Sequence, residues 1–203
     1  MNNVNKLDRY QLINDVWTHV SYIDYTYDEN GNRTSRTNYN SYGGPDFYIG
    51  GVYTYLYEDG VRNGWELSMG GNLVEKATLV YNEDGKLLEE LVKAGWGNGP
   101  FENSWKADYV YNEDGTLKNT LMNHWDAGSW NVVSSDWFEY DEHGNCIEWT
   151  HKNGNSVYDR YEYEYDLNYN FDQIVFLYNP EEDIATKTLV EMNNKLMLSH
   201  WYT

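Results

Sequence analysis

A short tyrosine-rich signature recurs along this chain at nearly constant spacing, and it constrains the fold more than any other feature. The signature reads Tyr-x-Tyr-(Asp/Asn)-Glu-(Asp/Asn/His)-Gly, and its four full copies begin at Tyr25, Leu79, Tyr109 and Phe138. Two degenerate copies begin at Tyr55, where one residue is missing, and at Tyr163, where Tyr169 replaces the glycine. The turn positions are therefore residues 31, 60, 85, 115, 144 and 169. A period of this length indicates an array of structural repeats.

Each repeat is predicted to contain two antiparallel strands and two turns. From Arg160 to Asp166 every second residue is a tyrosine and the residues between them are charged, which is the period of a strand with one buried face. Asn or Asp next to Gly tolerates the left-handed backbone of tight hairpin turns. A second turn is expected where two aromatic residues bracket four others, in the pairs Tyr42/Phe47, Trp96/Phe101 and Trp125/Trp130.

We therefore predict one all-β domain over residues 1–203, built from antiparallel β-hairpin repeats in a continuous meander of roughly a dozen strands. The repeat copies cover approximately residues 12–170, and a C-terminal hairpin over 171–203 turns at Asn193-Asn194. A sheet of this width is near the limit for an open sheet, so it is expected to curl. The pattern leaves an open twisted sheet, a half-barrel and a barrel as alternatives.

The charge of the chain excludes several classes of partner. Lys and Arg number 14 against 33 Asp and Glu, which gives a formal net charge of −19. A nucleic-acid-binding protein needs cations to displace counterions from phosphates, and an anionic membrane surface repels such a chain equally. No apolar run is long enough for a transmembrane helix. Aromatic residues make up 17% of the chain, which argues against disorder.

The copies Tyr25 to Arg33 and Phe138 to Cys146 resemble the tyrosine-aspartate (YD, or Rhs-type) repeat. The segment from Trp130 to Asn145 is similar, almost position by position, to tandem repeats of secreted and surface-anchored bacterial proteins. The resemblance implies a secreted or cell-surface location in a bacterium, with a signal sequence that has been removed from this chain. It implies no catalytic residues and no known activity.

The turns, histidines and cysteine do not form a recognisable metal or catalytic site. A calcium loop of the EF-hand type needs its first ligand five residues before the glycine, where the full copies carry Thr26, Val80, Val110 and Glu139. The five histidines show no paired metal spacing. Cys146 occupies a position that is leucine in two other copies, so we expect a buried apolar side chain. No metal and no cofactor are therefore predicted.

Two candidate sites involve carboxylates and tryptophans. Glu162 and Glu164 share one strand face, but no other copy repeats the pair, so we interpret them as part of a solvated face rather than as a glycosidase pair. Trp137 and Trp149 break the repeat and are the candidate ligand-binding residues. Trp137 falls opposite Phe138 and is therefore expected on the polar face, where an indole either packs or stacks on a sugar or a partner protein.

We predict from these observations a non-catalytic secreted or cell-surface repeat protein. It would act as a binding or structural module, with glycan or protein as its partner. Two alternatives from other classes stay open, a glycan-active enzyme and a lipocalin-like barrel that holds a small ligand. The sequence determines neither the ligand nor the oligomeric state.

Overall fold

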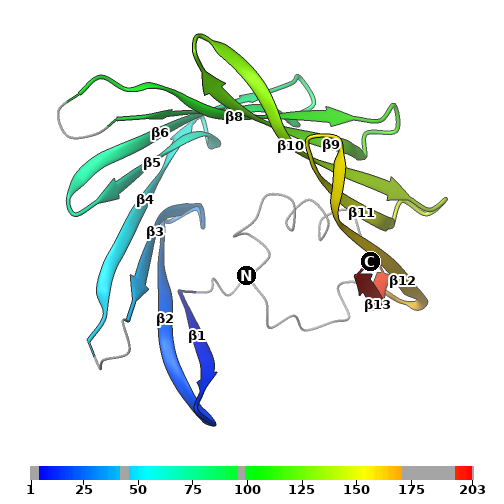
Figure 1. Ribbon diagram of the computed structural model, residues 1–203, viewed down its shortest axis with the longest axis horizontal. Coiled ribbons are helices and arrows are strands. Elements are labelled where there is room, and N and C mark those ends of the chain that lie inside the picture. The colour runs from blue at the N-terminus through cyan, green and yellow to red at the C-terminus, as the bar shows by residue number, and fades with distance from the viewer. Residues whose placement is uncertain (1–4, 42–45, 96–98, 171–194, 203) are drawn as a thin grey trace. The chain divides into compact units, whose positions relative to one another are not determined.

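The computed structural model describes residues 5–41, 46–95, 99–170 and 195–202, and it describes the backbone alone for 164–170 and 195–202. These residues form thirteen β-strands, and this part of the chain contains no helix (Figure 1). The strands are β1 (Lys6–Ile13), β2 (Val16–Tyr27), β3 (Arg33–Asn40), β4 (Tyr48–Glu58), β5 (Val61–Met69), β6 (Asn72–Tyr81), β7 (Leu87–Ala94), β8 (Glu102–Tyr111), β9 (Leu117–Asp126), β10 (Ser129–Tyr140), β11 (Cys146–Asn153), β12 (Ser156–Asn170) and β13 (Lys195–Tyr202).

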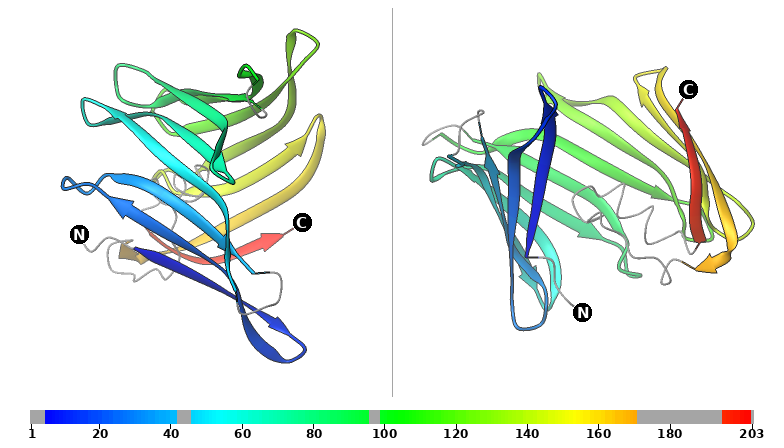
Figure 2. Two further views of the ribbon diagram at one scale, coloured as in Figure 1. Left: turned by 90° about the vertical axis from the view of Figure 1, so that its left-hand side faces the viewer. Right: turned by 90° about the horizontal axis from the view of Figure 1, so that it is seen from below.

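The sheet follows the chain, because each strand is hydrogen-bonded to the strands before and after it in the sequence. This confirms the predicted all-β antiparallel meander, and Figure 2 shows the successive hairpins. Within the described residues β1 and β13 stand at the two ends of the order. The strand order is thus open at both ends. Of the three alternatives left by the sequence, the closed barrel is the one that is not observed. A lipocalin-like module would require that closed sheet.

The chain divides into two compact units. The first comprises residues 1–80 and 90–104, and the second comprises residues 81–89 and 105–203. The assignment of all 203 residues to one domain stays a prediction. The predicted turn at Asn193-Asn194 lies outside the described residues.

A side-chain oxygen organises the turn of the repeat. Oδ1 of Asp28 accepts the backbone N–H groups of Asn30 at 2.9 Å and of Asn32 at 2.8 Å. Asn82 and Asp141 accept two N–H groups at the same offsets. The turn glycines of the four full copies have φ between 78° and 89°. A three-residue loop that ends in a left-handed residue is a common hairpin connection, and glycine adopts this conformation without steric cost.

The degenerate copies show what the glycine contributes. In the shortened copy Asp59 and Gly60 have φ of 50° and 80°, so both central residues of a two-residue turn are left-handed. In the last copy the strand β12 runs through Tyr169 without a turn. The turn predicted at residue 169 is therefore wrong, because a bulky residue resists the left-handed conformation.

The second turn of the repeat is shorter than predicted. Trp125 and Trp130 face each other as register partners, and their rings lie 4.9 Å apart in an edge-on arrangement. The strands continue to Asp126 and Ser129, so the loop contains two residues rather than four. In the other two pairs, Tyr42 and Trp96 lie outside the described residues.

A β-bulge follows the turn in four copies and was not predicted. The extra residue is the third after the turn glycine, and it has no partner on the opposite strand: Thr34, Asn63, Lys118 and Ile147. A bulge reverses the alternation of side chains along a strand. The residue two positions after the glycine comes before the bulge and pairs directly with the second signature tyrosine, so it points to the same face as that tyrosine.

The second tyrosine of the signature connects neighbouring repeats. The hydroxyl of Tyr57 donates to the carbonyl of Arg33 at 3.0 Å, and that of Tyr111 donates to the carbonyl of Leu87 at 2.9 Å. Tyr140 makes the same bond with the carbonyl of Leu117 at 2.8 Å. Burial raises the pKa of Tyr140, so the hydroxyl keeps the proton that it donates.

Each unit has its own small core on the tyrosine face. In the first unit Trp65, Ala77 and Val92 are buried, and the indole N–H of Trp65 donates to the buried Glu90 carboxylate at 2.6 Å. In the second unit five buried residues form one cluster, and two of them are the register partners of signature tyrosines: Ala107, Tyr109, Leu117, Phe138 and Cys146. Each large apolar side chain buried in this way stabilises the fold by about 1.5–3 kcal/mol.

The lowered pKa values of the turn aspartates predict that the folded state loses stability in acid. Hydrogen bonds from Asn32 lower the pKa of Asp28 below its ordinary value of 3.8. Burial opposes the corresponding shift at Asp141, but hydrogen bonds from Asn145 and His143 outweigh it and lower the pKa. A carboxylate with a lowered pKa stabilises the folded state above its ordinary pKa, and this contribution disappears as the pH falls through the folded-state value.

We therefore expect a D28N/D141N variant to lose less thermal stability than the parent between about pH 5 and about pH 2. Asparagine keeps the accepting oxygen, as Asn82 does in its own turn, but it does not titrate. Melting temperatures measured across this pH range test the expectation. An E29Q variant is the control, because Glu29 is exposed in the same turn. An equal loss in both variants would contradict the assignment.

Candidate functional site

Trp137 lies on the polar face of the second unit, where the alternation of β10 places it. It pairs with Thr150 of β11, and Thr150 in turn pairs with Arg160 of β12. Phe138, the next residue, points to the opposite face and is buried in the core. The Trp137 side chain stays 36% exposed. An indole is thus presented among charged and hydroxyl side chains.

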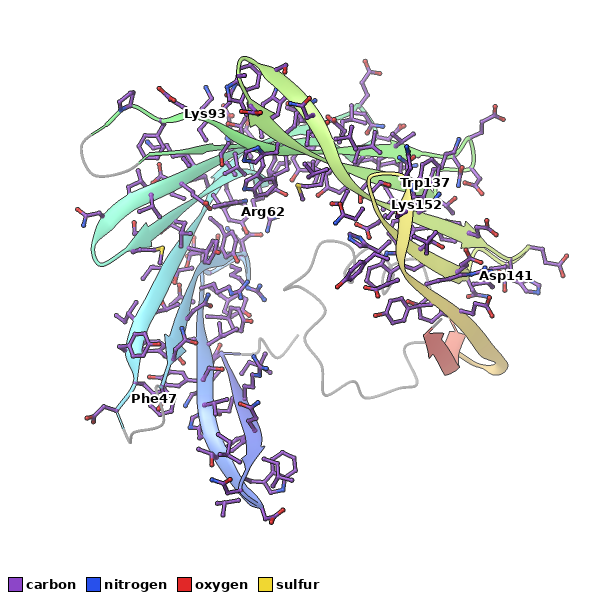
Figure 3. The ribbon with its side chains drawn as sticks, viewed as in Figure 1. Phe47, Arg62, Lys93, Trp137, Asp141 and Lys152 are labelled. Atoms are coloured by element: carbon purple, nitrogen blue, oxygen red, sulfur yellow. The ribbon has the colours of Figure 1, made fainter. Side chains whose placement is uncertain are left out.

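A hollow of about 240 Å³ lies beside this indole, and residues of three consecutive strands line it: Trp137, Glu139, Glu148, Thr150, Lys152, Val157 and Arg160. Figure 3 shows Trp137 and Lys152 next to each other. The ammonium nitrogen of Lys152 lies 4.7 Å from the centroid of the indole ring. The indole N–H donates to the Ser135 hydroxyl at 2.9 Å, which fixes the orientation of the ring.

Ion pairs hold the polar side chains of the hollow in place. Arg160 donates to Glu148 at 2.6 Å and lies 2.9 Å from Glu162. The Thr150 hydroxyl donates to the other oxygen of Glu148 at 2.8 Å. Glu139 and Glu148 are direct register partners on this face. The hollow therefore combines one flat apolar ring with several oriented hydrogen-bonding groups of both charges.

Trp149 does not belong to this hollow. It packs against the core cluster and stacks on Tyr161, with ring centroids 5.0 Å apart and an interplanar angle of 15°. Its indole N–H donates to Asp136 at 2.8 Å, and the same carboxylate contacts His151 at 2.8 Å and Thr120 at 3.1 Å. The structure thus places the two candidate tryptophans on opposite faces, and Trp149 has a packing role.

The remaining candidates from the sequence have structural roles or lie beyond the described side chains. Glu162 pairs with Arg160, and the side chain of Glu164 is outside the described part. Cys146 is fully buried, and burial raises the pKa of its thiol to about 12. A protonated, inaccessible thiol is not a nucleophile. Among the described residues no group of three or more His, Cys, Asp or Glu is arranged to hold a metal ion.

A partly exposed cluster of rings in the first unit was not predicted from the sequence. We call it the aromatic row, and it consists of Tyr10, His19, Tyr22, Tyr39 and Phe47. The rings of Tyr22 and Tyr39 stack at 4.3 Å, and those of Tyr10 and His19 stack at 4.8 Å. The register of β1, β2 and β3 could have revealed four of its members, and only Phe47 belongs to a pattern that the repeats share.

The comparisons with known proteins identify a similar fold and no family. No family model and no curated protein matches the chain. A porin-like protein from Bacteroides uniformis is similar over 95% of this chain and 77% of its own, with a TM-score of 0.56 and 14% identity. The crystal structure of TcdB2-TccC3-Cdc42 matches over 82% of this chain and 12% of its own, with a TM-score of 0.41 and 10% identity.

A third structure is a DUF3836 family protein from Parabacteroides distasonis, matched over 43% of this chain and 76% of its own, with a TM-score of 0.28 and 18% identity. At these identities the first similarity establishes the β-rich fold alone. The described part of the chain contains no helix that is long and apolar enough to span a membrane.

The packing role of Trp149 predicts a measurable loss of stability when it is replaced. Trp149→Phe removes a donor from the Asp136 carboxylate, and a lost hydrogen bond to a charged group costs about 1.5–3 kcal/mol. Trp17→Phe is the matched control, because this tryptophan is 70% exposed, and it should change the free energy of unfolding by less than about 0.5 kcal/mol. Urea denaturation measures both, and equal values would refute the packing role of Trp149.

Proposed function

We propose that this chain is a non-catalytic β-repeat module that is displayed outside a bacterial cell and binds carbohydrate at the hollow beside Trp137. The observation that carries the proposal is an indole that stays exposed on the polar face next to oriented charged groups. Sugars present flat C–H faces that pack on aromatic rings, and their hydroxyls bond to charged and hydroxyl side chains. The hollow offers both kinds of contact.

The repeat itself supports a module rather than an enzyme. The turn oxygens, the glycines and the signature tyrosines are all used in holding one strand to the next. The similarity of the turn sequences to YD-type arrays supports a place among the exported repeat proteins of bacteria. The strongly acidic composition keeps such a module soluble and away from an anionic envelope.

Lys152 covers part of the hollow. Its ammonium lies over the indole that a sugar would stack on. A cation over a ring at an exposed site contributes about 0.5–1 kcal/mol, which a stacked sugar replaces at small cost. The displaced ammonium then becomes a donor to the sugar hydroxyls at the edge of the hollow.

The test is calorimetric titration of the protein with a panel of neutral oligosaccharides. We expect at least one glycan to bind, and we expect Trp137→Ala to lower its affinity about fivefold or more, since stacking of a nucleic-acid base on an aromatic side chain contributes about 1–3 kcal/mol. Trp17→Ala is the matched control, because Trp17 is exposed and lies on β2 in the first unit. It should bind with unchanged affinity.

Two results would overturn the proposal. One is the absence of binding across the panel, or an equal loss in both variants. The other is cleavage of a bound glycan, which would make the opposed carboxylates Glu139 and Glu148 an acid–base pair and the protein an enzyme.

A further inference from the structure

The aromatic row carries a second inference, which is independent of the hollow at Trp137. Its rings share one face of the first unit with two carboxylates, since Lys6 pairs with Asp24, Asp8 pairs with Tyr22, and Tyr22 pairs with Tyr39. Tyr25, one residue beyond Asp24, is buried on the opposite face. The face of the row is accessible, because the Tyr10 side chain is 55% exposed and Lys6 and Asp8 are exposed as well.

The chain itself shows which group fits this surface. The ammonium nitrogen of Lys6 lies 4.1 Å from the centroid of the Tyr22 ring and 3.1 Å from Oδ1 of Asp8. The hydrogen bond to Asp8 raises the pKa of Lys6, and the charges of Asp8 and Asp24 act in the same direction. Tyr22 also stacks on the Tyr39 ring and contacts Phe47 edge-on. An aromatic ring flanked by carboxylates is a favourable binding position for an ammonium group.

Cations placed over aromatic rings recur in this chain, although its overall charge is strongly negative. In the described part, eight Lys and Arg side chains lie over aromatic rings: Lys6, Arg33, Arg36, Arg62, Lys76, Lys86, Lys106 and Lys152. The net charge nevertheless remains −19. A field of this sign attracts basic partners and accelerates their association.

We propose that the aromatic row binds the ammonium groups of a lysine-rich segment of a partner protein. One of these groups takes the position of Lys6 over Tyr22, and Lys6 moves into solvent. The row crosses β1, β2 and β3, about 10 Å at the usual strand spacing, so it is wide enough to contact the residues on either side of that lysine. This extent favours a peptide segment over a small free amine.

The experiment titrates the protein with a short oligolysine peptide at low and at moderate salt. Lys6→Ala should strengthen binding about twofold to fivefold, because the internal competitor is gone. Tyr22→Ala should weaken binding, and circular dichroism checks that this variant is folded. Lys118→Ala is the matched control, since Lys118 is exposed on β9 and its removal changes the net charge equally.

The outcomes distinguish specific binding of a lysine side chain at Tyr22 from nonspecific electrostatic attraction of the peptide. An equal gain for Lys6→Ala and Lys118→Ala would show diffuse electrostatics and would overturn the proposal. Binding of free spermidine as tight as that of the peptide would assign the row to small amines and would overturn the protein partner. Trp137→Ala should leave oligolysine binding unchanged, so this result is independent of carbohydrate binding at the hollow.

Discussion

The hydrogen bond from a tyrosine hydroxyl of one repeat to a backbone carbonyl of the preceding repeat is the contact on which the arrangement of hairpins depends. The ladder between β9 and β10 ends at the pair Asn119–Trp137, and Tyr140 reaches past this end to the carbonyl of Leu117. On the opposite edge of β9 the bulge at Lys118 interrupts the pairing with β8. Leu117 is fully buried, and a buried carbonyl needs a partner, which the tyrosine hydroxyl supplies.

In the second unit the residues that stabilise the fold and the residues of the candidate site lie on opposite faces of the sheet. One face carries the signature tyrosines and the residue two positions after each glycine, which is Leu87, Leu117 or Cys146 in successive copies of this unit. The other face carries none of these repeated positions, because each of them pairs directly with a signature tyrosine. Trp137, Lys152 and the carboxylates of the hollow lie on that face, where substitution leaves the core intact.

Much of the fold could be predicted from the sequence, because the glycine turns and the alternating tyrosines determine the backbone over only a few neighbouring residues. The turns at Gly31, Gly85, Gly115 and Gly144 lie where the signature places them. The bulges could not be predicted, since they depend on which residues oppose each other across two strands. For the same reason Trp149 was grouped with Trp137, although the residues follow opposite alternation.

The aromatic row and the buried Glu90 carboxylate could not be predicted for the same reason as the bulges. Both arise from residues brought together across strands: Trp65 reaches Glu90 from β5 to β7, and Tyr22 meets Tyr39 from β2 to β3. A repeat signature reports what the copies share. Binding sites in such a chain are expected where the copies differ, and there a single sequence gives only the composition of each strand.

The central claim is that tyrosine hydroxyls hold successive repeats together, and a Tyr57→Phe, Tyr111→Phe, Tyr140→Phe triple variant tests it most directly. Each bond contributes about 0.5–1.5 kcal/mol, so the account predicts that the free energy of unfolding in urea falls by about 2–4 kcal/mol. Tyr158→Phe, at a side chain that is 68% exposed, should leave it unchanged. A triple variant as stable as the parent would contradict the account.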